Sequence, residues 1–414
     1  MSSIYVLWDA SHLWGLLVVR ALREFGVPFS VVRGQAIAQG LLSGKSEPAA
    51  LVVPGGVARL KADALGAAGM DAVRAYVAGG GNYIGFCGGT GLGLTGAHGL
   101  GLCPWQRQTM RDRMLHLVSG HMHLAVPGGH ALVPEAIGHT PPAPIWWPAR
   151  FAPDDNPAVE ILGAYTTPGD DFWVADLPLT SLPHGTLADW EAMYGISLRP
   201  SSLAGQPCVV SGAYGAGRYV LSYAHLETPR SAKANAWLAH MLRVLAGVAT
   251  AKDAVGPWDM CAMPVRWDDG VLLRGRGVMD EIVRLGQNHF LLFMRNPWLF
   301  GWRAGIPGSH LNHLYALLAQ AQSVVPTDAA LRFWEARSGD FDRILTLFRD
   351  SVTGYLLAER LAMTLSKSFP DAVSPAGLKD SREALFGPPM EGGGLYAALI
   401  DLLDELVYLQ LAGD

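Results

Sequence analysis

A cysteine enclosed by glycines follows a short apolar segment, in the sequence Gly85-Phe86-Cys87-Gly88-Gly89. The pattern is that of a nucleophile elbow in which sulfur replaces the serine oxygen. Glycines on both sides allow neighbouring backbone to pass close to a tight strand-to-helix turn. The amide of Gly88 would then be directed at a developing oxyanion. We therefore predict that Cys87 is a nucleophile; the alternative is a small buried core residue.

A base for this thiol is offered by the segment His225-Leu226-Glu227. Residues i and i+2 of an extended chain point the same way, so Glu227 would orient His225 while His225 faces Cys87. The alternative is an ordinary surface pair after a strand.

A second glycine turn, "VVPGG" at residues 52–56, ends another predicted strand. It would present the amide of Gly56 as the second oxyanion donor, beside that of Gly88. Gly55 and Gly89 complete the predicted oxyanion and substrate-binding group. The alternative for residues 52–56 is a simple turn.

The elements that must position these residues alternate between strands and helices. A helix is expected from Ser11 as N-cap to Gly26, with Asp9 and Ser11 in capping roles, and another over residues 70–81. Nearly continuous apolar strands indicate a parallel sheet covered on both faces, with ligands beyond the carboxyl ends of the strands. The expected strands are residues 4–8, 29–32, 50–56, with a glycine turn at the end, and 83–86.

The middle of the chain, residues 100–205, is rich in Pro, Trp and His and less periodic. We expect irregular strands and long loops over the same sheet. A hairpin with a glycine-rich turn at Tyr214–Gly217 follows, and a helix over residues 231–247 closes the domain.

Long amphipathic helices dominate from about residue 250 onward. The expected domains are therefore residues 1–248, an α/β unit, and 249–414, a mostly helical unit of unknown role. In the last helix one apolar stripe is predicted, with Asp401, Asp404 and Glu405 away from it. The stripe consists of Leu395, Leu399, Leu402, Leu403, Leu406 and Leu409.

Taken together, the elbow and the later His-x-Glu resemble the class I glutamine amidotransferase-like superfamily. Within it the chain is most similar to the N-terminal-like domain of biotin–protein ligases, on "VVPGG", "GGGNYIGFCGG", "IWWPARFAP" and "GAYGAGRYVLSYAHLE" over the first 245 or so residues. The resemblance implies a flavodoxin-like three-layer fold. It also implies a triad of Cys87, His225 and Glu227, and an oxyanion hole of Gly56 and Gly88.

Two departures from this pattern concern glutamine. The glutamine amidotransferases usually carry a Gln soon after the elbow, where this chain reads Thr90-Gly91-Leu92, and His-Pro-Glu is replaced by His-Leu-Glu. The expected function is a cysteine-dependent amidase or amidotransferase-like hydrolase acting on a small amide or related acyl substrate. The alternative is a non-catalytic module that binds a metabolite or a partner. No cofactor is expected, and a partner enzyme or subunit is left open.

Composition excludes several other classes. The 414 residues carry a net charge of −5 and no dense Lys/Arg run, which argues against nucleic acid and anionic membranes as partners. No apolar run reaches the ~18–20 residues of a membrane span. Four dispersed cysteines, without a C-x-x-C pair, favour a reducing, cytoplasmic location over disulfides or structural zinc.

Two further motifs carry no cofactor prediction. His121, His123 and His130 would have to supply three ligands, but their spacing is not that of a zinc site, so no metal is expected. Gly89, Gly91 and Gly93 lack the G-x-G-x-x-G spacing of a dinucleotide loop.

Overall fold

The computed structural model describes residues 4–44, 47–108, 118–303, 305–388 and 392–413. The chain forms two compact units, Met1–Pro257 and Trp258–Asp414.

The segment after residue 248 packs within the first unit. The Ala251 amide donates to the Phe25 carbonyl at 2.7 Å, and the Arg230 amide donates to the Val255 carbonyl at 2.9 Å.

Five parallel strands form the centre of the first unit, in the order β2, β1, β3, β4, β13. Both faces of these strands are covered by helices, which is why their sequences are almost uninterruptedly apolar. The α/β class and the strands predicted from the sequence are confirmed. The bounds are Phe29–Val32, Ile4–Leu7, Ala50–Val53, Asn82–Phe86 and Gly217–Ser222.

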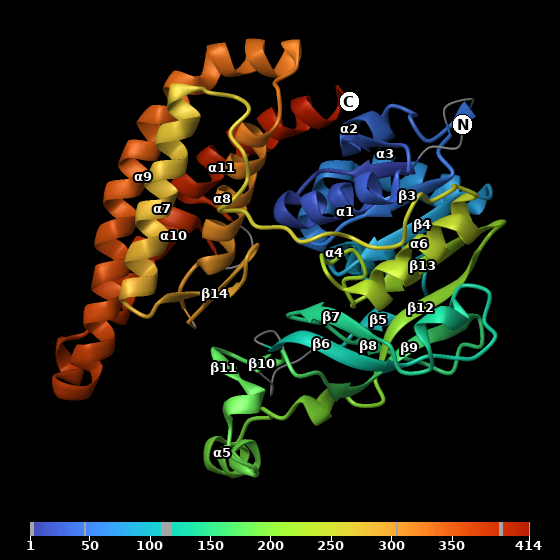
Figure 1. Ribbon diagram of the computed structural model, residues 1–414, viewed down its shortest axis with the longest axis horizontal. Helices are drawn as coiled ribbons and strands as arrows, with labels where there is room; N and C mark the ends of the chain where they lie inside the picture. Colours follow the sequence, from blue (N-terminus) through green and yellow to red (C-terminus); the bar gives the residue numbers. More distant parts are fainter. Residues whose placement is uncertain (1–3, 45–46, 109–117, 304, 389–391, 414) are drawn as a thin grey trace. The chain divides into compact units, whose positions relative to one another are not determined.

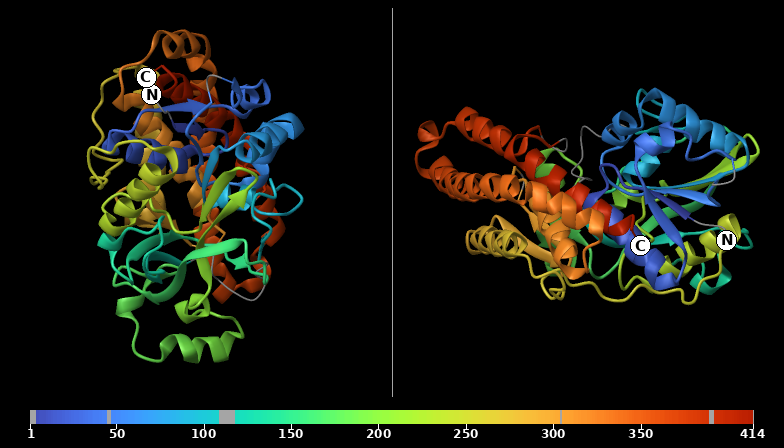
Figure 2. Two further views of the ribbon diagram at one scale, coloured as in Figure 1. Left: turned by 90° about the vertical axis from the view of Figure 1, so that its right-hand side faces the viewer. Right: turned by 90° about the horizontal axis from the view of Figure 1, so that it is seen from above.

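Helices lie on both faces of this sheet (Figures 1 and 2). Helices α2 (Gly34–Ala38), α3 (Ala58–Ala78) and α4 (Gly88–Gly93) share one hydrophobic core with the strands. The opposite face carries α1 (His12–Phe25) and α6 (Ala232–Ala246). The unit is thus three-layered, as the resemblance implied.

Helix α3 begins twelve residues before the predicted start at residue 70 (70 − 58 = 12). Gly66 interrupts it with φ 60° and ψ −178°, a conformation that only glycine adopts readily. This break divides the apolar periodicity of residues 58–78 into two short pieces, and only the second is recognisable in the sequence.

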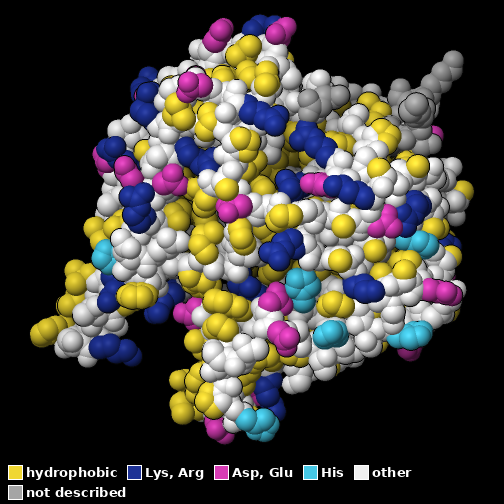
Figure 3. Space-filling model, in the orientation of Figure 1, with side chains coloured by type: hydrophobic (Ala, Val, Ile, Leu, Met, Phe, Trp, Pro, Cys, Tyr) yellow, Lys and Arg dark blue, Asp and Glu magenta, His cyan; other side chains and the backbone are white. Residues whose placement is uncertain are grey.

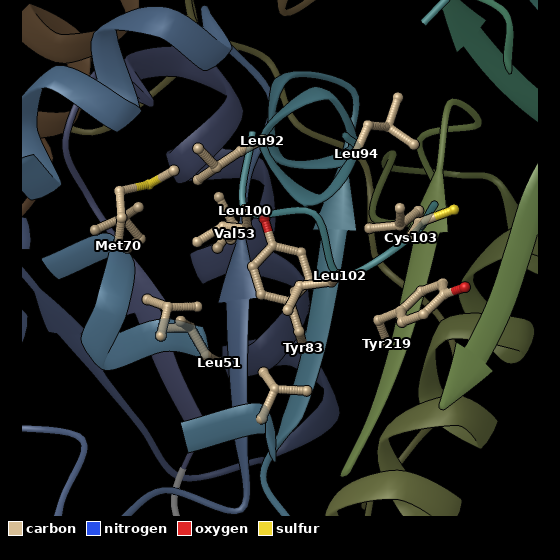
Figure 4. Packing of buried hydrophobic residues seen from close by; sticks show 14 of the residues in the cluster. Leu51, Val53, Met70, Tyr83, Leu92, Leu94, Leu100, Leu102, Cys103 and Tyr219 are labelled. Carbon is tan, nitrogen blue, oxygen red and sulfur yellow. The ribbon is translucent and has the colours of Figure 1, made fainter. Parts of the chain in front are cut away.

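The core between α3 and the sheet also supports the elbow (Figure 4). Leu51, Val53 and Met70 are buried there with Leu92 of α4. The Tyr83 ring lies among them, and its hydroxyl donates to the Gly89 carbonyl at 2.6 Å. Packing and one buried hydrogen bond therefore tie α4 to the strand that precedes Cys87.

Contrary to the expectation from the sequence, the middle of the chain does not lie over the sheet. It adds strands to one edge of the sheet instead. The hairpin of β12 and β13, with Gly215 and Ala216 at its turn, leaves the outer edge of β12 open. Antiparallel strands fill that edge in succession, since exposed backbone groups at an edge favour pairing. Outward from β12 (Pro207–Tyr214), the strands are β9 (Val159–Pro168), β6 (Val118–Ala125), β10 (Trp173–Val174) and β11 (Leu177–Pro178). Strand β7 (Pro142–Trp146) also pairs with β6.

Short elements complete the first unit. Strands β5 and β8 form a separate antiparallel pair near the elbow. The bounds are Gln106–Arg107 and Phe151–Ala152 for β5 and β8, Thr186–Tyr194 for α5, and Glu135–Ile137, Leu179–Ser181 and Pro200–Leu203 for the 3-10 helices η3, η4 and η5.

The second unit is helical around a small hairpin. Its centre is α8 (Gly308–Ser323), which is buried along almost its whole length and packs against its neighbouring helices. The other elements are α7 Gly270–Asn288, β14 Leu292–Asn296, β15 Leu299–Trp302, α9 Asp328–Ser368, η6 Pro370–Ala372, α10 Pro375–Phe386 and α11 Gly394–Leu411.

The predicted stripe of α11 is largely confirmed. Leu399, Leu402, Leu403 and Leu406 are buried, whereas the outer members of the stripe are half-buried. Asp404 departs from the prediction, because it is buried together with the stripe. Helix α11 packs against both α8 and α9, and this wider covered face takes in the position of Asp404.

Within the described residues, no helix is both long and apolar enough to span a bilayer. On the face drawn in Figure 3, basic and acidic side chains are interspersed with apolar ones.

Candidate catalytic site

Cys87 occupies the turn between β4 and α4 with φ 47° and ψ −100°. A positive φ is strained for any residue other than glycine, and such strain is found preferentially at functional sites. Two contacts hold the turn: the Cys87 amide donates to the Ser222 carbonyl at 2.8 Å, and the Thr90 hydroxyl lies 2.8 Å from that same carbonyl oxygen. Cys87 as a whole residue is half-buried.

The glycines of the elbow are required by backbone that passes within contact distance. A methyl group on Gly88 would lie 2.1 Å from the Gly56 carbonyl oxygen, and one on Gly89 would lie 2.0 Å from the Val53 carbonyl oxygen. The elbow is therefore pressed against the turn after β3, and Gly56 and Gly88 lie side by side. Within the described residues, neither amide donates a hydrogen bond to the backbone.

His225 and Glu227 follow β13 and form a fully buried pair. The His225 Nδ1 atom lies 2.8 Å from the Glu227 Oε1 atom. Among the described residues, His225 Nε2 and Glu227 Oε2 have no hydrogen-bond partner of good geometry. One ring nitrogen is thus oriented by a carboxylate, and the other is available to the thiol.

The His225 ring is held by packing as well. The Trp14 ring lies against it, with 4.7 Å between ring centroids. A methyl group on Gly55 would lie 2.9 Å from Trp14 and 3.3 Å from His225 Cε1. Gly55 therefore leaves room for the imidazole.

The thiol and the imidazole each shift the other's pKa. Burial raises the pKa of Cys87, but the nearby His225 imidazolium and, more weakly, the Arg107 guanidinium outweigh it, so that the pKa lies below its ordinary value. Burial lowers the pKa of His225, but the Glu227 carboxylate and the Cys87 thiol raise it to about 10. Both shifts favour a thiolate beside an imidazolium over the neutral pair.

Three residues near the thiol were not found from the sequence. The hydroxyls of Tyr165 and Tyr223 are buried and, among the described residues, unpartnered. Burial raises the pKa of both hydroxyls and keeps them neutral donors; the charge of Cys208, for Tyr165, and that of Cys87, for both, add to this effect.

The third residue, Arg107, lies on β5, which pairs with β8. It lies opposite Phe151, whose ring packs on Tyr223 at 4.6 Å between centroids. Only Tyr223 had a signal in the sequence, since it precedes His225 by two positions and alternation places it on the same side.

The capping roles expected for Asp9 and Ser11 are wrong. The Asp9 carboxylate accepts from the Gly34 amide at 2.7 Å, and Ser11 makes no side-chain cap for α1. The Ser11 hydroxyl instead lies 2.5 Å from the Nζ atom of Lys61, which is fully buried and also donates to the Asp9 carbonyl. A buried ammonium requires such acceptors, and this requirement outweighs helix capping.

The three histidines considered for zinc are separated in the structure. His121 bonds to Asp171 and Ser231, and His130 lies 3.5 Å from Glu160. Within the described ranges, no three His, Cys, Asp or Glu side chains gather as metal ligands would.

Comparison with known proteins finds one related family. Residues 35–97 match the family described as "Biotin-protein ligase, N terminal". The matched segment contains β3, the glycine turn at residues 54–56, β4 and the elbow at Cys87. Over this segment the chain is therefore similar to the N-terminal domain of biotin–protein ligases. No curated protein matches the chain.

Several solved structures are similar at low scores. A ThuA-like protein from Bacteroides uniformis has 11% identity and a TM-score of 0.36, over 59% of this chain and 91% of its own. A GMP synthase component from Thermoplasma acidophilum has 12% identity and a TM-score of 0.37, over 60% of this chain and 95% of its own. A cytoplasmic protein from Salmonella typhimurium has 8% identity and a TM-score of 0.35, over 61% of this chain and 100% of its own.

Proposed function

We propose that the first unit is a cysteine-dependent hydrolase of small amides, with Cys87, His225 and Glu227 as its triad. The observation that carries this proposal is the buried Glu227–His225 pair beside a thiol with a lowered pKa on a strained elbow. Strain, a prearranged base and an ionised nucleophile are the conditions for nucleophilic acyl transfer.

The reaction would proceed through a thioester. The Cys87 sulfur attacks the amide carbon, and the Gly56 and Gly88 amides stabilise the resulting oxyanion. The C–N bond then breaks as the His225 imidazolium protonates the leaving nitrogen. His225 next takes a proton from water, which attacks the thioester and releases a carboxylic acid.

Polar groups around the sulfur favour a small polar substrate. The buried hydroxyls of Tyr165 and Tyr223 would regain hydrogen bonds on a ligand, because buried polar groups in proteins are normally satisfied. Thr90, at the position following the elbow, is engaged with the Gly85 and Ser222 carbonyls and cannot serve as a glutamine ligand. An amide other than free glutamine is therefore the expected substrate class.

The first test is thiol alkylation of the whole chain with iodoacetamide at pH 6, followed by peptide mass spectrometry. Cys87 should react at least ~10-fold faster than the exposed Cys261, since only thiolate is alkylated. His225→Gln should remove that advantage. Equal rates at both cysteines in the folded protein would contradict the proposal and favour a non-catalytic binding module.

The second test is release of ammonia or amine from a panel of small amides. Cys87→Ala should abolish the release from any amide that the protein cleaves. Cys208→Ala is the matched control, because Cys208 is a buried cysteine on β12 whose thiol bonds to the Gly163 carbonyl.

A further inference from the structure

A second nucleophile constellation lies in the first unit and does not use Cys87. The Ser231 hydroxyl lies 2.9 Å from His121 Nε2, and His121 Nδ1 lies 2.9 Å from Asp171 Oδ2. The other carboxylate oxygen of Asp171 accepts from the His121 backbone amide at 2.8 Å. Serine, histidine and aspartate are thus linked in the order that activates a serine.

Three separate segments bring these residues together. His121 belongs to β6, Asp171 to the turn between β9 and β10, and Ser231 to the residue before α6. The Gly169 amide donates to the His121 carbonyl at 2.8 Å and fixes the turn that carries Asp171. The Asp171 carboxylate therefore hydrogen-bonds to both the ring and the backbone amide of His121, and these two bonds set the orientation of the imidazole.

Ser231 stands at the start of a helix of fifteen residues but does not cap it. Its side chain makes no hydrogen bond to the first-turn amides of α6; the hydroxyl lies 2.9 Å from His121 Nε2 and donates more weakly to the Pro229 carbonyl at 3.4 Å. The preceding residue, Arg230, has φ 60°, a strained value for a non-glycine residue. The first-turn amides of α6 are left without a side-chain cap.

The histidine and the aspartate are partly exposed, whereas the serine is buried. Ser231 is 4% exposed, whereas the side chains of His121 and Asp171 are 26% and 45% exposed. On β6, Ser119 shares a face with His121 and lies opposite Trp146 and Trp173.

We infer that Ser231, His121 and Asp171 form a second acyl-transfer site, which takes carboxylic esters. The Ser231 oxygen bonds to the acyl carbon while its proton passes to His121 Nε2. The ester C–O bond then breaks, and His121 protonates the leaving alcohol. Water hydrolyses the acyl-serine by the reverse proton route and yields the acid.

The test is labelling of the intact protein with an alkyl fluorophosphonate, read by peptide mass spectrometry. The Oγ–P bond forms, the P–F bond breaks, and fluoride leaves as His121 takes the proton. Ser231 should be the labelled residue. His121→Gln and Asp171→Asn should each slow labelling at least ~10-fold, as loss of a base or its orienting group does.

Two controls separate this site from the Cys87 site. Prior alkylation with iodoacetamide should leave the labelling of Ser231 unchanged, and in a Cys87→Ala background the remaining hydrolysis of p-nitrophenyl butyrate should be removed by Ser231→Ala. Ser211→Ala is the matched serine control, since Ser211 is buried on β12 and bonds to the Tyr219 carbonyl. Unlabelled Ser231 in folded wild-type protein, or equal labelling in His121→Gln, would overturn the inference.

Discussion

At the scale of single residues, the proposed chemistry depends on one shared proton. Burial alone would keep the Cys87 thiol and the His225 imidazole neutral, because low polarity penalises both charges. The Glu227 carboxylate, 2.8 Å from the ring, reverses that balance for the imidazole, and the imidazolium in turn reverses it for the thiol. Glu227 therefore acts on the sulfur mainly through His225.

Glu227→Gln tests this indirect action. The substitution removes a negative charge that by itself raises the pKa of Cys87, yet it also removes the main cause of the raised pKa of His225. The second effect should dominate, since the ion pair requires the imidazolium. Alkylation of Cys87 at pH 6 should fall at least ~10-fold, corresponding to about one pKa unit. Faster alkylation would show that the direct charge effect prevails.

At the scale of elements, the geometry of the elbow depends on the close approach of two turns. The turn after β3 and the start of α4 approach so closely that side chains on Gly88 or Gly89 would overlap backbone atoms. This approach places the Gly56 and Gly88 amides side by side. The glycines are thus a requirement of packing between elements as much as of local conformation.

Gly89→Ala should strongly destabilise the first unit. Its methyl group would lie 2.0 Å from the Val53 carbonyl oxygen, and backbone on both sides would have to move. We expect a loss of at least ~2 kcal/mol in the free energy of unfolding, measured with urea. Gly96→Ala is the matched control, because nothing lies within 4 Å of its methyl position. Equal stability of the two variants would refute this account of the elbow.

At the scale of the whole molecule, the buried pair links the stability of the protein to pH. In a Cys87→Ala background, Glu227 still raises the pKa of His225 above the unfolded value of 6.5. The folded state then holds the proton more tightly than the unfolded state. The resulting stabilisation is complete below about pH 6.5 and is lost as pH rises through the folded pKa.

The measurement compares Cys87→Ala with Cys87→Ala/His225→Gln by urea unfolding from pH 6 to pH 10. The difference in free energy of unfolding between them should shrink by at least ~1 kcal/mol over this range, since each pKa unit corresponds to about 1.4 kcal/mol. A difference that grows with pH would mean that His225 is neutral when buried.

Local patterns in the sequence determined the class of the first unit and its most specific residues. Apolar runs separated by glycine turns specify buried parallel strands, and the glycines around Cys87 specify a tight turn, because both signals lie within a few consecutive residues. His225 and Glu227 were linked by simple alternation along an extended chain. These features require no knowledge of which segments meet.

Only the tertiary structure decided which distant segments meet. His121 reaches Ser231 through a strand added at an open sheet edge, and Arg107 lies on a separate antiparallel pair of strands. Such pairing depends on which edge remains free once the hairpin has formed and on packing across more than a hundred residues. Short-range periodicity contains no information about the free edge or about long-range packing. These contacts could therefore not be predicted from the sequence.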